Sequence, residues 1–316
     1  YACEYAADFG GDPEQDTLDC TNSIQRIAQG SDTLKPEKSE NTSIGFVWTP
    51  TDNLTISLDY WSIEKEDTIG LFGEENHTLL DLLSRLEQGT SNCGGANFND
   101  AISRQSIDEG EEQYYLNAGI CPAGAIKYID DQYANLDDRT VEGHDLGIYY
   151  NVDTKYGTFD FKYNGAFLDT YDQDAGGDAK LLVDAQNAGI IPQSYPVDGF
   201  ADLIGKDGNQ DERHSVKLRW YRDAWGVSAN MFKVGSFYQS SLTLDDGTKY
   251  KIPSVTTYNA SVDYKFELAG IDSRVKVGVR NLTDERAPLA DRYFGYFADA
   301  HSDYGRAYYV ELRAKF

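Results

Sequence analysis

Aromatic side chains are the residues of this sequence best suited to binding a small molecule. Their rings stack on sugars or aromatic chelates, and the tyrosine hydroxyls add hydrogen bonds. Polar stretches between apolar segments carry several of them. We predict ligand-binding roles for Tyr114, Tyr115, Tyr133, Tyr293, Phe294, Tyr296 and Phe297. The alternative is that these rings pack the loops together, and the sequence does not decide between the two interpretations.

Metal-binding and catalytic signals are weak by comparison. The oxygen-rich segment 207–212 is a candidate calcium loop, although it lacks the spacing of an EF-hand. The four histidines are isolated, and no GxSxG, P-loop or GxGxxG motif is present. We therefore expect no enzyme, and no cofactor apart from calcium at this segment.

The four cysteines all lie in polar, loop-like stretches. Their even number predicts two disulfides and an oxidising compartment. We expect Cys3 to pair with Cys20 and Cys93 with Cys121, because these are neighbours in the sequence. The sequence begins at Tyr1 without a methionine or a leader, so we expect that a leader was removed or that the chain is a fragment.

The charge balance limits the partners. With 28 Lys and Arg against 53 Asp and Glu, the net charge is −25. A nucleic-acid-binding protein needs a basic face, so this composition argues against nucleic acid. No run of 18 apolar residues occurs, and we expect no transmembrane helix.

The elements that position these residues are indicated by alternation of apolar and polar side chains. At the C-terminus, Tyr308, Val310, Leu312 and Phe316 share one face, and Glu311 and Arg313 occupy the other. The same pattern recurs eight times upstream and predicts nine strands. They cover residues 44–48, 54–60, 146–150, 159–167, 215–221, 225–231, 258–266, 274–280 and 308–316.

The connections between these strands alternate in length. Short turns are predicted at 50–53, 153–157, 222–224 and 267–273, and long connections at 68–138, 171–211, 235–253 and 283–305. Outer-membrane β-barrels have short turns on one side and long extracellular loops on the other. Aromatic residues near the short turns indicate a membrane-interface belt: Trp48, Phe159, Trp220, Trp225, Phe266 and Phe316. One short loop helix is expected, where Leu79, Leu82, Leu83 and Leu86 recur at helical spacing before Gly89.

The odd number of strands has a consequence. Bacterial antiparallel barrels close with an even number of strands, and an open edge in lipid leaves backbone groups unsatisfied. We therefore predict an all-β, antiparallel transmembrane β-barrel segment that is part of a larger barrel, with further strands N-terminal to it. In this interpretation residues 1–41 form an extracellular loop, residues 42–316 form the barrel strands and loops, and the apolar face contacts the lipid bilayer.

Three segments resemble the family of TonB-dependent outer-membrane receptors. They are LKPEKS at 34–39 with the strand and turn that follow, GVRNLTDE at 278–285, and Tyr304-Gly305-Arg306 before the last strand. The resemblance implies a 22-stranded barrel with an N-terminal plug and a TonB box, neither of which this sequence contains. It also implies coupling to the TonB system, and recognition of Tyr308, Val310, Leu312 and Phe316 by the barrel assembly machinery.

The functional expectation follows from this resemblance. It is active uptake of a scarce solute, such as an iron chelate, cobalamin or an oligosaccharide, across the outer membrane of a Gram-negative bacterium. Two alternatives remain open: a passive porin-type channel, and a soluble all-β carbohydrate-binding protein. The sequence does not identify the transported substrate.

Overall fold

The structure is a computed structural model that describes residues 24–91, 93, 98–107, 110–193, 195–244, 248–290 and 294–315. The chain divides into two compact units. The loop unit comprises residues 1–39, 65–139 and 173–201, and the barrel unit comprises residues 40–64, 140–172 and 202–316.

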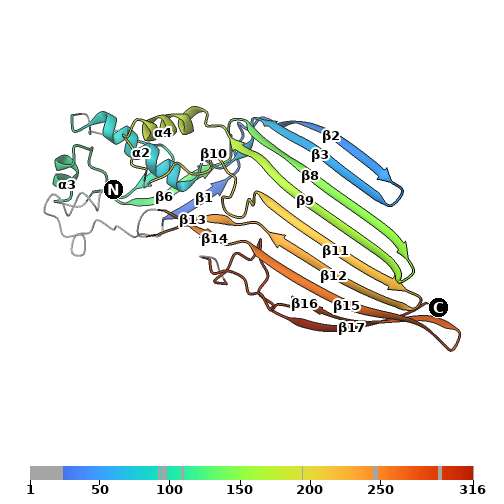
Figure 1. Ribbon diagram of the computed structural model, residues 1–316. Coiled ribbons are helices and arrows are strands. Elements are labelled where there is room, and N and C mark those ends of the chain that lie inside the picture. The colour runs from blue at the N-terminus through green and yellow to red at the C-terminus, as the bar shows by residue number, and fades with distance from the viewer. Residues whose placement is uncertain are drawn as a thin grey trace. The chain divides into compact units, whose positions relative to one another are not determined.

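The barrel unit is built on one large sheet (Figure 1). Its long strands are β2 (Lys38–Thr51), β3 (Leu54–Glu66), β8 (Arg139–Thr154), β9 (Gly157–Gln173), β11 (Glu212–Arg222), β12 (Trp225–Val234), β15 (Val255–Leu268), β16 (Ile271–Arg280) and β17 (Ala307–Lys315). Each long strand pairs with the long strand before and after it in sequence, and β10 (Ala201–Asp202) adds to β9. The nine predicted strands are confirmed, and the first, predicted at 44–48, extends over Lys38–Thr51.

The sheet does not close on itself within the described residues. Its strands run in the order β17-β16-β15-β12-β11-β9-β8-β3-β2, so β2 and β17 lie at its two edges. This is the arrangement expected of a segment of a larger barrel, and it confirms the predicted fold class.

The register explains the alternation in the sequence. Phe159, Trp220, Val227, Val262, Val277 and Val310 occupy one continuous row across β9, β11, β12, β15, β16 and β17. We call the face that carries this row the outward face. Val262 and Val277 lie within the sheet, yet they remain 43% and 54% exposed. An apolar face that none of the described residues covers is typical of a surface that contacts lipid.

The opposite face, which we call the lumen face, is polar. One row on this side contains Lys162, Lys217, Asn230 and Asn259. A single-residue shift of register would place such residues in the apolar rows, so the alternation fixes how neighbouring strands pair.

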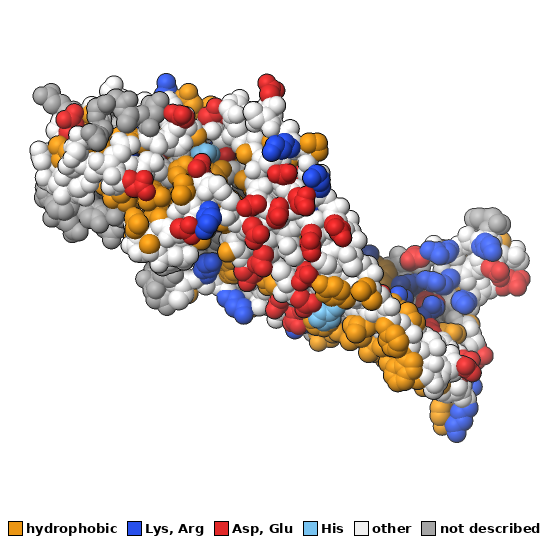
Figure 2. Space-filling view, turned by 90° about the horizontal axis from the view of Figure 1, so that it is seen from above, with side chains coloured by type: hydrophobic (Ala, Val, Ile, Leu, Met, Phe, Trp, Pro, Cys, Tyr) orange, Lys and Arg blue, Asp and Glu red, His pale blue; other side chains and the backbone are white. Residues whose placement is uncertain are grey.

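Toward the long loops, the outward face changes from apolar to acidic. His144 stacks on Phe167, and its ring pairs with Asp169 at 2.8 Å. Glu142 and Glu212 lie on the outward face at the same ends of their strands. Figure 2 shows acidic side chains gathered beside an apolar band, with a histidine at the boundary. The apolar band therefore ends before the long strands do.

The short turns lie where the sequence predicts them. Asp223 and Ala269 have φ values of 50° and 53°, and Gly270 has φ 77°. Positive φ values of this kind suit the tight hairpins that match the right-handed twist of a sheet. The long connections carry additional structure: β13 (Phe237–Thr243) and β14 (Lys249–Ile252) form a hairpin that packs, through Phe237 and Ile252, on Phe297.

The loop unit contains three helices among the described residues. They are α2 (Glu74–Gln88), α3 (Glu112–Asn117) and α4 (Gly177–Asn187). The single helix predicted from Leu79 to Gly89 is confirmed as α2, but the expectation of one helix was wrong. In α4 the buried residues are Ala179, Leu182 and Ala185, which pack against Leu79 and Leu83 of α2. None of the helices is long and apolar enough to cross a membrane.

Short strands complete the loop unit. They are β1 (Gln25–Gln29), β4 (Ile69–Gly70), β5 (Ile102–Arg104), β6 (Ile126–Gln132) and β7 (Ala134–Asn135). β6 is the central strand of a three-stranded sheet, with β1 parallel on one side and β5 antiparallel on the other. Residues distant in the sequence thus meet along β6.

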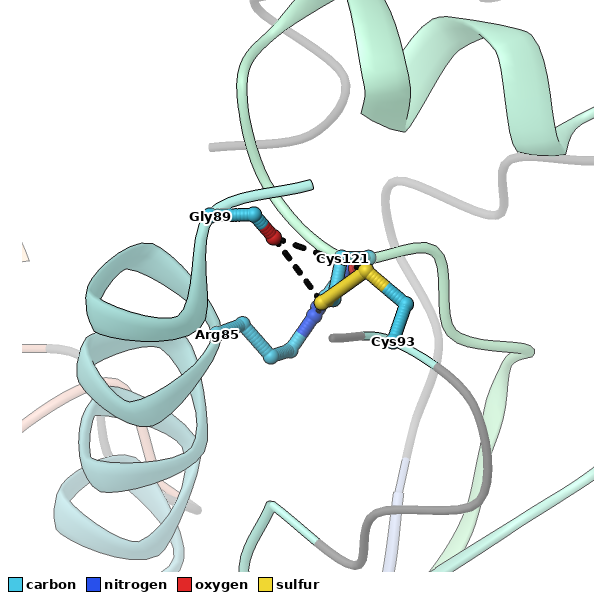
Figure 3. The surroundings of a disulfide bond; sticks show 4 residues. All are labelled: Arg85, Gly89, Cys93 and Cys121. Carbon is cyan, nitrogen blue, oxygen red and sulfur yellow. Dashed lines mark hydrogen bonds between the residues drawn. A yellow bond between two sulfur atoms is a disulfide. The ribbon is translucent and has the colours of Figure 1, made fainter. Parts of the chain in front are cut away.

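A disulfide joins Cys93 to Cys121, as the sequence predicts, across 28 residues of chain. Figure 3 shows the bond beside the end of α2, where Arg85 Nε donates to the carbonyl oxygen of Cys121 at 2.8 Å. The two sulfur atoms lie 2.9 and 3.4 Å from the carbonyl oxygen of Gly89. Because a disulfide sulfur carries no hydrogen, these are packing contacts. The predicted Cys3–Cys20 bond lies outside the described residues.

Candidate functional site

The loop unit contains a cleft with a volume of about 630 Å³. Its lining comes from the segment after β3, from α2, β6 and β7, and from the start of α4. The lining residues are Asp67, Phe72, His77, Asp100, Ala101, Asp130, Gln132, Ala134, Asn135, Leu136, Asp137, Gly176, Gly177, Asp178, Ala179 and Phe200. We call this the aspartate cleft.

One wall of the aspartate cleft is held by a buried carboxylate. Asp131 has a fully buried side chain and accepts from His77 Nε2 at 3.2 Å and from the Gly73 backbone N–H at 3.2 Å. Arg26 Nε lies 3.1 Å from the same carboxylate. A buried carboxylate with three donors is well satisfied. It orients His77. The ring centroids of His77 and Phe72 lie 4.9 Å apart in an edge-to-face arrangement.

A buried amide connects this wall to the chain before Phe200. Asn76 is 1% exposed and donates to the carbonyl oxygens of Phe72 and Asp198 at 2.6 and 2.8 Å. The Asp198 backbone N–H donates to Asn76 Oδ1 at 2.9 Å. These bonds position Phe72 and Phe200, whose ring centroids lie 6.1 Å apart. The two rings give the cleft an apolar surface.

The start of α4 forms a further part of the lining. Asp137 Oδ2 approaches Gly176 so closely that a Cβ atom there would lie 2.3 Å from it. Glycine is therefore required at 176 while Asp137 keeps this position. The carboxylate lies beside the N-terminus of a helix, which favours negative charge.

Among the described residues, the lining carries five aspartates and no lysine or arginine. Asp130 accepts from Gln29 and Gln132, whereas Asp67, Asp100 and Asp178 have no side-chain donor among the described residues. Such a lining repels anionic groups and favours a neutral, hydroxyl-rich or positively charged ligand. Within the described chain, no group of three or more His, Cys, Asp or Glu side chains is arranged to hold a metal ion.

A second buried network, of charged side chains, lies in the loop unit near the disulfide. Arg104 and Arg85 both approach Asp81, which is 2% exposed. Burial and the neighbouring Arg104 lower the pKa of Arg85, and burial raises the pKa of Tyr115. The Arg85 guanidinium lies 4.8 Å from the centre of the Tyr115 ring. This network holds the end of α2 to α3.

The structure separates the predicted aromatic residues into different roles. Tyr115 and Phe297 are buried, at 9% and 2% exposed, and pack within their own units. Tyr133 is 41% and Phe294 73% exposed. Tyr114 packs on the cluster around Tyr115, and Tyr296 lies 6.1 Å from Phe294. Tyr293 lies outside the described residues, and the ligand-binding role of the set remains a prediction.

The candidate calcium segment is engaged by protein donors. Asp207 accepts from the backbone N–H and the hydroxyl of Ser240, at 2.9 and 2.6 Å. The side chain of Gln210 accepts from Arg213 Nε at 2.8 Å. Protein donors therefore occupy the side-chain oxygens of Asp207 and Gln210. Calcium at 207–212 remains a prediction.

The aspartate cleft itself was missed by sequence reasoning. Its residues come from five separate stretches of chain, and in a sequence with 53 carboxylates close pairs such as Asp130-Asp131 are expected by chance. The signal in the sequence that could have indicated the cleft is the repetition of Asp pairs at 130–131 and 137–138 within one long loop.

Comparison with known proteins identifies the family. The family model for the β-barrel of TonB dependent receptor-like proteins matches residues 5–282. The chain belongs to the TonB-dependent receptor family. Among curated proteins, no sequence match was found.

Solved structures of receptors and transporters agree with this fold. The ferric enterobactin receptor of Pseudomonas aeruginosa shares 15% identity, with 92% of this chain and 33% of that chain covered and a TM-score of 0.53. The iron transporter FrpB of Neisseria meningitidis shares 11% identity, with 92% and 32% covered and a TM-score of 0.50. At these identities the likeness supports the fold. The chain spans about a third of the length of the structures that it matches.

Proposed function

We propose that this chain is part of a TonB-dependent transporter in the outer membrane of a Gram-negative bacterium, and that it takes up a scarce solute. The observation that carries the proposal is the combination of an uncovered apolar outward face with a separate, structured loop unit. A passive channel needs the first feature but has no use for a built cleft in its long loops. The proposal includes no enzymatic step.

The aspartate cleft is the proposed capture site. Its two phenylalanine rings and its carboxylates match a hydroxyl-rich solute, since rings stack on sugar faces and carboxylates accept from hydroxyls. Among the three solute classes that the resemblance allows, the acidic lining favours an oligosaccharide over an anionic iron chelate.

The remaining partners belong to the same proposal. Energy coupling would come from the TonB system through parts of the receptor outside this sequence. The outward residues Tyr308, Val310 and Leu312 of β17 would be recognised by the barrel assembly machinery, together with Phe316, which lies outside the described residues.

Uptake by cells that express the full receptor tests the proposal. Labelled oligosaccharides, iron chelates and cobalamin are supplied with and without a protonmotive-force uncoupler. We expect uptake of one class, and its loss with the uncoupler. Uptake that persists in the presence of the uncoupler would instead indicate a passive porin.

Variants of the cleft locate the site within the receptor. Asp178→Asn together with Phe200→Ala should weaken binding of the transported solute by about tenfold or more, because one charge-assisted bond and one stacking surface are lost. Glu285→Gln, an exposed carboxylate outside the loop unit, is the control. Unchanged affinity in the double variant would remove the cleft as the capture site while leaving transport in place.

A further inference from the structure

Strands β9 and β11 are neighbours in the sheet (Figure 1). Three cations lie together on the lumen face where these strands pair. Lys162 and Lys217 are directly opposite each other in the register, and Arg219 is the next lumen-facing residue along β11. They share a cavity of about 340 Å³ on the half of the strands nearer the short turns. We call these residues the lysine pair and its arginine.

Like charges directly opposite each other destabilise a sheet unless something neutralises them. The lumen-facing row continues from the lysine pair to Asn230 and Asn259 and contains no carboxylate. Neither lysine forms an ion pair within the described residues. Lys162 Nζ lies 4.7 Å from the centre of the Tyr149 ring, which is a contact between a cation and a π face.

The carboxylates nearest to this group do not satisfy it. Asp160 lies directly opposite Arg219, but it accepts a hydrogen bond from Asn151 Nδ2 and forms no ion pair with the arginine. Asp52, in the turn between β2 and β3, is the other acidic residue that lines the cavity. Arg219 Nε is buried without an acceptor among the described residues. A buried donor without a protein acceptor is satisfied by water or by a bound ion.

We propose that the lysine pair and its arginine form a binding site for an oxyanion, a carboxylate or phosphate group, on the barrel wall. Guanidinium and ammonium groups donate to the oxygens of such a group in short, charge-assisted bonds. The Tyr149 ring and the Tyr221 ring, which lies 5.4 Å from the Arg219 guanidinium, hold the cations in place. The site is separate from the aspartate cleft and does not rest on the proposed uptake of a solute.

An oxyanion at this site has two sources, a dissolved anion or an acidic side chain of a polypeptide in the lumen. Isothermal titration of the full detergent-solubilised receptor with inorganic phosphate tests the first source. We expect binding that weakens by about tenfold or more in Lys162→Gln/Lys217→Gln, because two charged donors are lost. Lys276→Gln is the matched control, since this lumen-facing lysine lies opposite Asp263 and Glu311 and should leave binding unchanged.

Thermal unfolding of the same proteins without phosphate tests the second source. If a polypeptide carboxylate occupies the site, phosphate does not bind, and the double variant unfolds at a lower temperature than the wild type at low ionic strength. Salt should then remove this difference. Absence of phosphate binding together with a double variant as stable as the wild type, or more stable, would overturn the proposal. That result would mean that the lysines only repel each other.

Discussion

The ion pair between Arg286 and Asp303 connects the two ends of the last long loop. Arg286 Nε donates to Asp303 Oδ1 at 2.7 Å, and the Ala287 backbone N–H donates to the same oxygen at 3.0 Å. The arginine and this backbone bond lower the pKa of Asp303 from 3.8 to about 2. The contribution of this ion pair to the stability of the loop therefore depends on pH.

The sign of that dependence follows from the lowered pKa. A carboxyl whose pKa is lower in the folded state contributes stability that is complete above its unfolded pKa and is lost as pH falls toward its folded pKa. We expect hydrogen-exchange protection of the Ala287 amide to be constant above pH 3.8 and to fall as pH approaches about 2. Asp303→Asn should lower protection above pH 3.8, match the wild type as pH approaches about 2, and remove this step. An identical step in the variant would assign it to another group.

The disulfide gives a second prediction for single residues. Cys93→Ser/Cys121→Ser opens a loop of 28 residues, which the chain-entropy relation converts to a loss of about 3.5 kcal/mol. The measurement is protease cleavage within residues 93–121 as urea concentration rises, in the full receptor. We expect cleavage at lower urea in the variant, and reduction should shift the wild type in the same way. If reduction does not change the urea concentration at which the wild type is cleaved, the disulfide does not form.

Residue-level prediction from the sequence succeeded where neighbours along the chain decide the outcome. Cys93 and Cys121 pair as expected because both lie in the same long connection. Asp131, by contrast, becomes the support of the aspartate cleft through donors at positions 26, 73 and 77. No local pattern relates those positions, so the fold had to be known first.

At the scale of elements, the packing of α4 on α2 holds the loop unit together. Leu182 is fully buried in this contact, whereas its neighbour Leu181 is 54% exposed. Leu182→Ala should cost about 2–5 kcal/mol of the stability of this unit, because it leaves a cavity. Leu181→Ala on the same helix should cost about 0.5 kcal/mol or less. Urea unfolding followed by cleavage within 177–187 compares them, and equal costs would contradict the packing of α4.

The same helix shows why the sequence predicted some elements and missed others. In α2 the leucines recur at helical spacing, so the pattern itself predicts a helix. In α4 three apolar residues, 181–183, are consecutive, and two of the buried positions are alanines. Such a run does not distinguish a helix from a buried strand, and the packing against α2 decides it. The long strands were predicted because alternation of apolar and polar residues is typical of a strand with two different faces, although the runs at 44–48 and 146–150 mark only part of β2 and β8.

At the scale of the whole molecule, the distribution of charge separates what contacts lipid from what contacts water. The net charge is −25, and the acidic side chains are absent from the described apolar rows. They lie in the loops, at strand ends and on the lumen face. The sequence predicted this division, because each apolar residue of a strand alternates with a polar one. It did not predict the separate loop unit, whose residues come from three stretches of chain.

This division predicts that the two faces of one strand differ sharply in their tolerance of charge. Ala229 and Ser228 are neighbours on β12 with small side chains, and Ala229 lies in the outward row of Leu218 and Ala260. Ala229→Arg places a charge against hydrocarbon and should cost about 2–4 kcal/mol near the middle of the bilayer. Ser228→Arg faces the lumen opposite Arg219, where like-charge repulsion costs below about 1 kcal/mol. Urea unfolding of the full receptor in phospholipid vesicles measures both costs. If the outward substitution is tolerated as well as the lumen one, the outward face contacts water rather than lipid, and the barrel interpretation fails with it.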